Sequence, residues 1–411
     1  MRIGLLGGSF DPFHIGHEAL IKGAINDGNV DCVIVIPSCR NPFKPGKTLS
    51  AAPYRYYMTK NAIASNRFFD GKVFVSDIEY SYPGISYTLT TIKEISKPNY
   101  IRTFLSSMGI DKELVYANHS FYWICGSDIL PSFEKWHEPE KILGLCGLLV
   151  ASRPGDGIDI DSQKNRLAGI FGFEPNITEF PISGYVAASS DIRVTRDYSL
   201  VPDSVKDFII TNALYGDENP IDFVSADCAQ DFYENAIKLY KYLGEKRLLH
   251  TLNVALLSCH YAHVFNPDLC DKALIAGELH DCAKELDEEL QWEMAREISG
   301  DTFDHKKLIH SPAGALFAQR EFGVHDPAIL DAIMYHTTGR GDMEALDKYV
   351  YVADKLEPAR TYADLTRERV LAEVDLDESI KLIIGNVKKK FESRGQDIHP
   401  LTFDFIDDLG V

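Results

Sequence analysis

A glycine-rich segment that ends in two histidines could bind a polyphosphate. It reads Gly7-Gly8-Ser9-Phe10-Asp11-Pro12-Phe13-His14-Ile15-Gly16-His17 and follows a short apolar run that predicts a strand. Glycines let the backbone approach phosphate oxygens, and the N-terminus of the next helix offers N–H groups. His14 and His17 lie three residues apart, so both imidazoles fall on one helical face and could stabilise charge when an α-phosphate is attacked. A glycine-rich turn with two capping histidines is the alternative for this segment alone.

Six residues in the second half have the composition of a metal site: His250, His280, Asp281, His310, His336 and Asp354. Imidazole and carboxylate suit first-row metals, and one bridging carboxylate can serve two ions. Six such positions therefore favour two metals. His260 and His263 fall on other faces of the helix that starts near His250, so we interpret them as packing or surface residues.

The totals favour a protein of more than one domain. A chain of 411 residues with 45% apolar residues exceeds the size at which a single core stops growing. The formal charge of −19 argues against binding to nucleic acid or an anionic membrane, since both need clustered basic residues. Small anionic substrates stay compatible with this charge.

The elements of the first half alternate between strands and helices, which predicts an α/β domain with a Rossmann-like, doubly wound parallel sheet. An apolar run at residues 142–151 is about half the length that a bilayer requires, so we interpret it as a buried strand. Residues 99–120 fit an insertion before the central strand. Strands are predicted at residues 3–6, 32–37, 73–75, 121–125 and 145–150.

The second half has little strand signal and is predicted to be all-α. Helical spacing of apolar residues covers 231–243, 248–263, 271–284 and 328–337. The polar segment 216–222 separates domains at 1–216 and 223–411. No signal peptide or membrane span is recognised, and the eight cysteines contain no C-x-x-C pair, so we expect reduced thiols in a cytoplasmic protein.

Further segments of the first half follow the histidine segment in a fixed order. They are Pro37-Ser38-Cys39-Arg40-Asn41-Pro42-Phe43-Lys44, Tyr54-Arg55-Tyr56-Tyr57-Met58, Ser86-Tyr87-Thr88, Gly126-Ser127-Asp128, Trp136, Arg153-Pro154-Gly155 and Ser189-Ser190-Asp191-Ile192-Arg193. With these segments the first half resembles the nicotinate-nucleotide adenylyltransferases of the H-x-G-H nucleotidyltransferase superfamily. The resemblance implies transfer of AMP from ATP to nicotinate mononucleotide, giving deamido-NAD and pyrophosphate, with Mg²⁺ on the phosphates.

The same resemblance implies a role for individual residues. His14, His17 and Arg193 would be catalytic and hold the ATP phosphates. ATP would also contact Gly7, Gly8, Ser9, Phe10, Gly126, Asp128, Ser189, Ser190 and Ile192. The mononucleotide would contact Lys44, Thr88, Trp136 and Arg153, although Thr88 and Trp136 could instead be packing residues and Lys44 a surface charge. Ser9 and Ala188 depart from the family pattern, which usually has Thr and Ser there.

Five segments of the second half carry the candidate metal ligands. They are His250-Thr251-Leu252, His280-Asp281-Cys282-Ala283-Lys284, His310-Ser311-Pro312-Ala313-Gly314, His336-Thr337-Thr338-Gly339 and Ala353-Asp354-Lys355-Leu356-Glu357-Pro358-Ala359-Arg360. With these segments the second half resembles the YqeK-type HD-domain phosphohydrolases, which split dinucleoside tetraphosphates symmetrically. The resemblance implies a dinuclear iron centre, with manganese as the alternative, and catalytic roles for Asp281 and Lys284. Lys284, Lys355 and Arg360 would steer the polyphosphate or would be surface charges.

Two alternatives stay open at this point. The HD module could only sense a nucleotide, and the first domain could act on nicotinamide mononucleotide or phosphopantetheine. The expected partners are ATP, nicotinate mononucleotide and dinucleoside polyphosphates, with no nucleic acid and no membrane. The sequence also allows a homo-oligomer.

Overall fold

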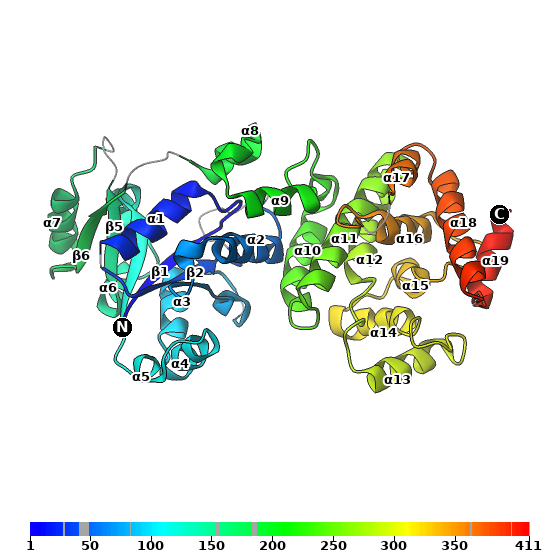
Figure 1. The fold of residues 1–411 in the computed structure, drawn as a ribbon, viewed down its shortest axis with the longest axis horizontal. Helices are drawn as coiled ribbons and strands as arrows, with labels where there is room; N and C mark the ends of the chain where they lie inside the picture. The colour runs from blue at the N-terminus through cyan, green and yellow to red at the C-terminus, as the bar shows by residue number, and fades with distance from the viewer. Residues whose placement is uncertain are drawn as a thin grey trace. The chain divides into compact units, whose positions relative to one another are not determined.

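A computed structural model describes residues 1–27, 29–40, 49–82, 84–152, 157–182, 187–361, 364–395 and 397–410. Within them the chain divides into two units, Met1–Ile210 and Thr211–Val411. The first runs from blue to green in Figure 1 and the second from green to red.

A parallel sheet with the strand order β3-β2-β1-β4-β5-β6 organises the first unit (Figure 1). Strands β2 and β5 are rich in Val, Ile and Leu and are buried on both faces, as expected for a sheet covered by helices on each side. The order reverses between β1 and β4, so a crevice forms where the loops that follow these strands diverge. The strands are β1 (Arg2–Gly8), β2 (Cys32–Pro37), β3 (Val73–Val75), β4 (Ser120–Gly126), β5 (Gly147–Ser152) and β6 (Ile177–Pro181).

The predicted α/β architecture is confirmed, with two differences in detail. β6 was not predicted, because two of its five residues, Thr178 and Glu179, are polar and adjacent. Its buried and exposed positions also alternate only weakly. The prediction of one buried strand at residues 142–151 was wrong. Residues 142–145 are the last residues of helix α6 (Pro139–Leu145), in which Ile142 and Leu143 are buried and Leu145 is exposed. Residues 147–151 belong to strand β5. Apolar runs of this length do not separate a strand from a buried helix.

Helices cover the sheet of the first unit and connect its strands. Residues 99–120, which the sequence left unassigned, contain most of α4, all of α5 and the start of β4. The other helices of this unit are also short or of moderate length. The helices are α1 (Ile15–Asn26), α2 (Ala52–Ser65), α3 (Thr88–Ile95), α4 (Pro98–Ser107), α5 (Lys112–Val115), α6, α7 (Ile160–Phe171), α8 (Ser189–Thr195) and α9 (Asp203–Thr211).

The described residues of the second unit form helices and no strand, which confirms the all-α prediction. The predicted helix at 271–284 is shorter than expected, because α12 ends at Leu279 and His280 begins a turn. None of the helices described in the chain is long and apolar enough to span a bilayer. The helices are α10 (Ala226–Leu239), α11 (Glu245–Phe265), α12 (Cys270–Leu279), α13 (Glu288–Ser299), α14 (His310–Phe322), α15 (Pro327–Tyr335), α16 (Ala345–Leu356), α17 (Thr366–Ala372), α18 (Leu376–Arg394) and α19 (Pro400–Asp408).

Candidate functional site

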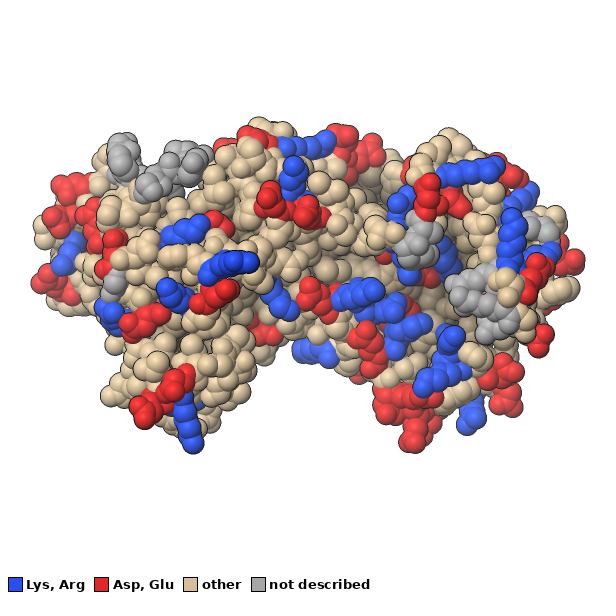
Figure 2. Space-filling view, in the orientation of Figure 1, with Lys and Arg blue, Asp and Glu red and all other residues tan. Residues whose placement is uncertain are grey.

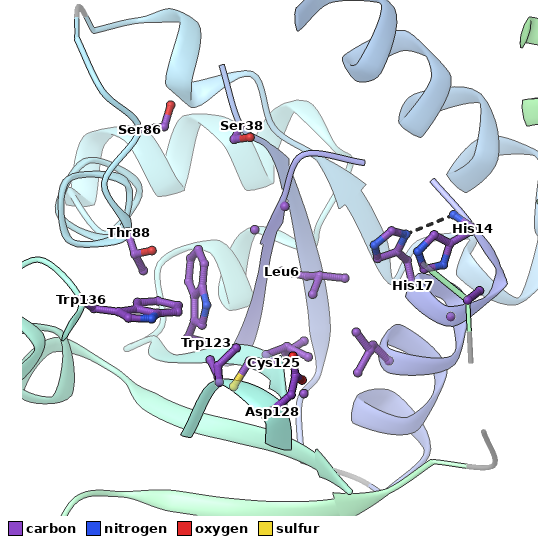
Figure 3. A pocket seen from close by; sticks show the side chains of 18 of the residues that line it. Leu6, His14, His17, Ser38, Ser86, Thr88, Trp123, Cys125, Asp128 and Trp136 are labelled. Atoms are coloured by element: carbon purple, nitrogen blue, oxygen red, sulfur yellow. Dashed lines mark hydrogen bonds between the residues drawn. The ribbon is translucent and has the colours of Figure 1, made fainter. Parts of the chain in front are cut away.

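The two histidines of the glycine-rich segment lie at the start of α1. His14 is the residue before the helix, and its backbone N–H donates a 3.1 Å hydrogen bond to Nδ1 of His17. Because Nδ1 of His17 accepts a hydrogen bond, Nε2 carries the proton and is a donor. The two rings are stacked with centroids 3.7 Å apart (Figure 3). The pair is therefore held rigidly at a helix N-terminus, which favours an anion.

A cavity of about 360 Å³ opens at the carboxyl ends of β1 and β4. Figure 3 shows the histidine pair on one side of it and Trp123, Trp136 and Thr88 on the other. Eight residues predicted to contact ATP or the mononucleotide line this cavity: Gly7, Gly8, His14, His17, Thr88, Gly126, Asp128 and Trp136.

Two tryptophans form the wall opposite the histidines. The indoles of Trp123 and Trp136 meet edge to face with centroids 6.5 Å apart, and Phe133 supports Trp136 at 5.2 Å. Gly7 has to be glycine here, because a Cβ at this position would lie 2.4 Å from the Trp123 ring. Sequence reasoning missed Trp123, since an aromatic residue inside an apolar strand is usually core.

Glu79 also lines the cavity and was not predicted. Its carboxyl accepts hydrogen bonds from the Cys39 N–H at 2.9 Å and from the Thr91 hydroxyl at 2.7 Å. Burial raises the pKa of Glu79 above its ordinary value, although its hydrogen-bond donors and Arg55 lower it. Ser38 and Ser86, which also line the cavity, lie within segments that carried the resemblance but had no assigned role.

The 189–193 segment contacts the same loop from another side. Arg193 donates to the backbone carbonyl of Asp11 and lies 3.5 Å from its carboxylate, and Ser189 donates to the Pro12 carbonyl at 3.0 Å. The structure thus brings residues 189–193 to the glycine-rich segment after β1 but does not place them in the cavity wall. The remaining predicted residues are Ser9, Phe10 and Ile192, which are buried, and Ser190, which is exposed. Lys44 and Arg153 lie outside the described residues.

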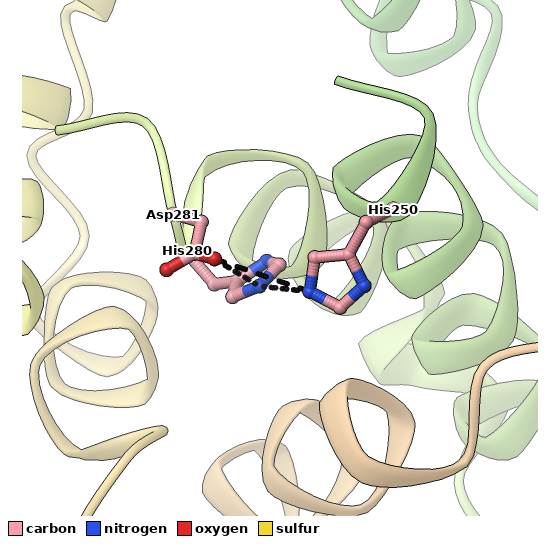
Figure 4. A group of neighbouring side chains, drawn as sticks. All are labelled: His250, His280 and Asp281. Carbon is pink, nitrogen blue, oxygen red and sulfur yellow. Dashed lines mark hydrogen bonds and ion pairs between the residues drawn. The ribbon is translucent and has the colours of Figure 1, made fainter. Parts of the chain in front are cut away.

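The six predicted metal ligands of the second unit lie together, although they come from five places in the chain. His250 lies on α11, the His280–Asp281 pair in the turn after α12, His310 at the start of α14, His336 just after α15 and Asp354 on α16. All six side chains are buried. Figure 4 shows the His250 ring facing His280 and Asp281.

The donors form two groups that share Asp281: His250 with His280 and Asp281, and Asp281 with His310 and His336. Oδ2 of Asp281 lies 3.6 Å from Nε2 of His280 and 3.9 Å from Nε2 of His250. Oδ1 lies 3.3 Å and 3.5 Å from Nε2 of His310 and His336. Asp354 joins the first group, with Oδ1 3.1 Å from Nε2 of His250. One carboxylate therefore faces both groups, as a bridging ligand must.

Hydrogen bonds outside these groups orient three of the imidazoles. Nδ1 of His280 donates to the Gly277 carbonyl at 2.7 Å, and Nδ1 of His336 donates to the Ile333 carbonyl at 2.7 Å. Nδ1 of His250 pairs with the Glu357 carboxylate at 3.1 Å. In each ring this leaves the Nε2 lone pair directed at the site, which is the arrangement of metal-binding histidines. Glu357 was missed, although it lies in a segment quoted for the resemblance.

The electrostatics of the donor set fit a divalent cation. Burial lowers the pKa of His280 to about 3 and that of His310 well below its usual range, so both imidazoles are neutral ligands. Nε2 of His280 faces Nε2 of His250 at 3.3 Å, and the buried Oδ1 of Asp281 accepts no hydrogen bond from the described residues. Converging lone pairs around a buried carboxylate need a positive charge between them.

Basic side chains surround the same donors. Arg247 contacts Oδ2 of Asp281 at 2.5 Å, and Lys284 lies 2.7 Å from Nε2 of His310. Lys355 and Arg360, the proposed steering residues, pair with Asp354 at 2.7 Å and 2.9 Å. Figure 2 shows Lys and Arg side chains gathered over the middle of this unit, despite the acidic chain. Arg247 was not predicted, because a single arginine on a helix carries no distinguishing signal.

Comparison with known families agrees with this division. Residues 5–193 match the cytidylyltransferase-like family, and residues 247–359 match the HD domain. The fold and the two sites thus define a nucleotidyltransferase domain joined to an HD domain.

Similar proteins indicate a more specific family for each half of the chain. The chain is 32% identical over 220 residues to the probable nicotinate-nucleotide adenylyltransferase of Desulfitobacterium hafniense, covering 52% of this chain and 95% of that protein. It is 41% identical over 164 residues to the symmetrical bis(5'-nucleosyl)-tetraphosphatase of Bacillus subtilis, covering 39% and 88%. A Mycoplasma genitalium protein named probable nicotinate-nucleotide adenylyltransferase/Ap4A hydrolase is 26% identical over 391 residues, covering 95% of each chain. The chain belongs to the nicotinate-nucleotide adenylyltransferase family in its first half and to the symmetrical bis(5'-nucleosyl)-tetraphosphatase family in its second.

Proposed function

We propose that the protein is a bifunctional enzyme. Its first unit transfers AMP from ATP to nicotinate mononucleotide, which gives deamido-NAD and pyrophosphate. Its second unit hydrolyses dinucleoside tetraphosphates symmetrically, so that diadenosine tetraphosphate gives two ADP. The observation that carries the second activity is the complete donor set around Asp281, and the cavity between the histidine pair and the tryptophan wall carries the first.

In the first unit the protein positions two nucleotides and neutralises charge. A phosphate oxygen of the mononucleotide attacks the α-phosphorus of ATP, and the bond to the β-phosphate breaks, so no covalent enzyme intermediate is needed. The Nε2–H of His17 and the start of α1 face the cavity and would stabilise the charge that develops on the leaving pyrophosphate. His14 and Arg193 would share this role, with Ser9, Phe10, Ser189, Ser190 and Ile192 shaping the phosphate site. Mg²⁺ bound with ATP would neutralise part of its phosphate charge.

The opposite wall would bind the nicotinate ring. Trp136 offers an aromatic surface and Thr88 a hydroxyl next to it (Figure 3). Lys44 and Arg153 would meet the mononucleotide, and Asp128 and Gly126 would contact the adenosine. The alternatives are nicotinamide mononucleotide and phosphopantetheine, which product analysis separates.

In the second unit Asp281 would bridge two divalent ions, one held with His250, His280 and Asp354 and the other with His310 and His336. We propose iron, with manganese as the alternative; the bound ions would activate water and neutralise phosphate charge. Lys284 would hold a phosphate oxygen beside His310, and Lys355 and Arg360 would draw the polyphosphate toward the site. The complete donor set favours hydrolysis over a module that only senses a nucleotide.

One preparation tests both activities. Purified protein should form deamido-NAD faster than NAD or dephospho-coenzyme A, should contain transition metal, and should convert diadenosine tetraphosphate to ADP as the sole nucleotide product. Release of AMP with ATP would contradict symmetrical cleavage. Metal-replete protein that binds the tetraphosphate without cleaving it would support the sensing alternative. Location in the cytoplasm, absence of nucleic-acid and membrane partners, and a homo-oligomer stay predictions.

A further inference from the structure

A second cavity, of about 700 Å³, lies beside the metal donors of the second unit, and the proposed roles leave it unused. Its walls come from residues 304–308, the turn after α15, α16, α18, residue 395 and residues 397–402. This volume is typical of sites for small organic ligands.

Two residues belong both to this cavity and to the surroundings of the donors. Thr337 lines the cavity, and its hydroxyl lies 3.0 Å from Nε2 of His336 and 3.2 Å from Nε2 of His310. Lys355 also lines it, and its ammonium pairs with Oδ2 of Asp354 at 2.7 Å. A ligand that fills the cavity would therefore reach the His310–His336 side of the site, with a lysine at the passage.

The cavity wall combines apolar, acidic and basic side chains, which suit the base, the ribose and the phosphates of a nucleotide. Leu308, Val387, Phe391 and Ile398 offer an apolar surface for a planar base. Other wall positions carry the carboxylates of Asp304 and Asp397, which accept hydrogen bonds and suit ribose hydroxyls. Lys307, together with Lys355, adds positive charge for phosphate.

The C-terminal helix fixes the backbone around Thr338. The Thr402 hydroxyl donates to the Thr338 carbonyl at 2.9 Å. The next residue, Gly339, has φ +67°, and a Cβ there would lie 2.3 Å from the fully buried Phe405 ring. Helix α19 therefore packs directly on the turn that carries Thr337 and Thr338, and it closes one side of the cavity.

We propose that this cavity binds one nucleoside of the dinucleoside tetraphosphate, with its phosphates passing Lys355 toward Asp281. The apolar surface contacts the base, and α19 shapes the pocket. This inference rests on the proposed hydrolase function and adds to it the place where one nucleoside is recognised.

Val387→Trp tests the pocket, because Val387 is only partly buried and a larger side chain there would occupy the cavity rather than the core. Two inhibitors of tetraphosphate hydrolysis are compared: ADP, which carries a nucleoside, and inorganic tetraphosphate, which does not. We expect the inhibition constant of ADP to rise by about 10-fold or more, because the larger side chain fills the space that the nucleoside would occupy. The inhibition constant of inorganic tetraphosphate should stay unchanged. The exposed Val370→Trp on α17 is the matched control and should change neither constant.

Direct titration with ADP separates this proposal from the proposed activity. Relative to the wild type, the Val387→Trp variant should lose one equivalent of bound ADP, whether or not the wild type cleaves the tetraphosphate. A wild type that fails to cleave it but loses this equivalent on substitution would refute the hydrolase and keep the pocket. Equal shifts for ADP and inorganic tetraphosphate, or unchanged ADP binding in the Val387→Trp variant, would overturn the pocket.

Discussion

The guanidinium of Arg55 donates a 2.8 Å hydrogen bond to the backbone carbonyl of Ser9, in the loop that leads to the histidine pair. The same group donates to the Ser50 carbonyl at 2.9 Å and to the Cys39 carbonyl at 3.3 Å. Arg55 is 2% exposed and comes from α2. One buried side chain therefore ties the loop after β1, which leads to the histidine pair, to the segment after β2.

Arg55→Lys should lower kcat/KM of the adenylyltransferase by roughly 10- to 100-fold, because small misplacements of substrate-binding groups have effects of this size. Lysine keeps the charge but cannot bond three carbonyls in the planar geometry of a guanidinium. Steady-state rates of deamido-NAD formation would measure the effect. Tetraphosphate hydrolysis by the same preparation should stay normal, and the exposed Arg67→Lys should leave both activities normal. Wild-type kinetics for the Arg55 variant would show that the loops hold their positions without it.

His17→Ala should lower transferase kcat by roughly 10²- to 10³-fold, as expected for one donor to transition-state charge. The imidazole offers Nε2–H toward the cavity because Nδ1 is engaged by the His14 backbone. The matched control is His119→Ala, a histidine of the same unit that bonds the Val115 carbonyl outside the cavity. Near-normal turnover of the His17 variant would remove this residue from the catalytic group.

Glu79→Gln should stabilise the first unit increasingly as the pH rises above about 4.5. The pKa of Glu79 is raised by burial, so the folded state keeps a proton that the unfolded chain releases above its ordinary pKa. The wild type therefore loses folding free energy from pH 4.5 upward until the raised pKa is passed. Glutamine resembles the protonated acid and can still accept from the Cys39 N–H.

Thermal unfolding midpoints at several pH values would test this prediction. The difference between Glu79→Gln and the wild type should be small at pH 4 and larger at pH 7. The exposed Glu140→Gln is the control and should show no such trend. A difference that is constant across this range would mean that the pKa of Glu79 is not raised in the folded protein.

Much of the fold and site could be predicted because the signals are local. Five of the strands in the described sheet follow from β-rich apolar runs, and the six metal donors follow from residue type within family-like segments. The prediction failed where two structures share one pattern: the run at 142–151 is apolar in both its helical and its extended part. The helix expected at 271–284 ended early, because the turn at His280 is stabilised by its own Nδ1 bond to the Gly277 carbonyl.

The residues that sequence reasoning missed act through the fold rather than through a motif. Trp123 reaches the cavity because the order of β1 and β4 opens a crevice there, and Glu357 reaches His250 from 107 residues away. Such contacts depend on how helices and strands pack, which spacing along one chain does not describe. The predicted limits 1–216 and 223–411 stay predictions about the domain boundary.

The shared position of Asp281 leads to a prediction about the two metals. Asp281→Asn keeps the shape of the side chain but removes the negative charge that faces both donor groups. We expect it to lose both ions, whereas His336→Ala, which changes only the group with His310, should lose about one of two. Metal content per chain, measured on protein purified without added metal, distinguishes the two variants.

Activity should follow metal content only in the second unit. Both variants should lose tetraphosphate hydrolysis, since activation of water needs both ions. Deamido-NAD formation should persist, because its proposed residues, His14 and His17, lie in the first unit, whereas these donors lie in the second. Reciprocally, His14→Ala should spare hydrolysis.

An Asp281→Asn protein that binds no metal and still cleaves diadenosine tetraphosphate at the wild-type rate would refute the metal-hydrolase assignment. Equal metal loss from Asp281→Asn and His336→Ala would instead show that the two ions bind as one cooperative unit, and Asp281 would not be distinguished as the bridge.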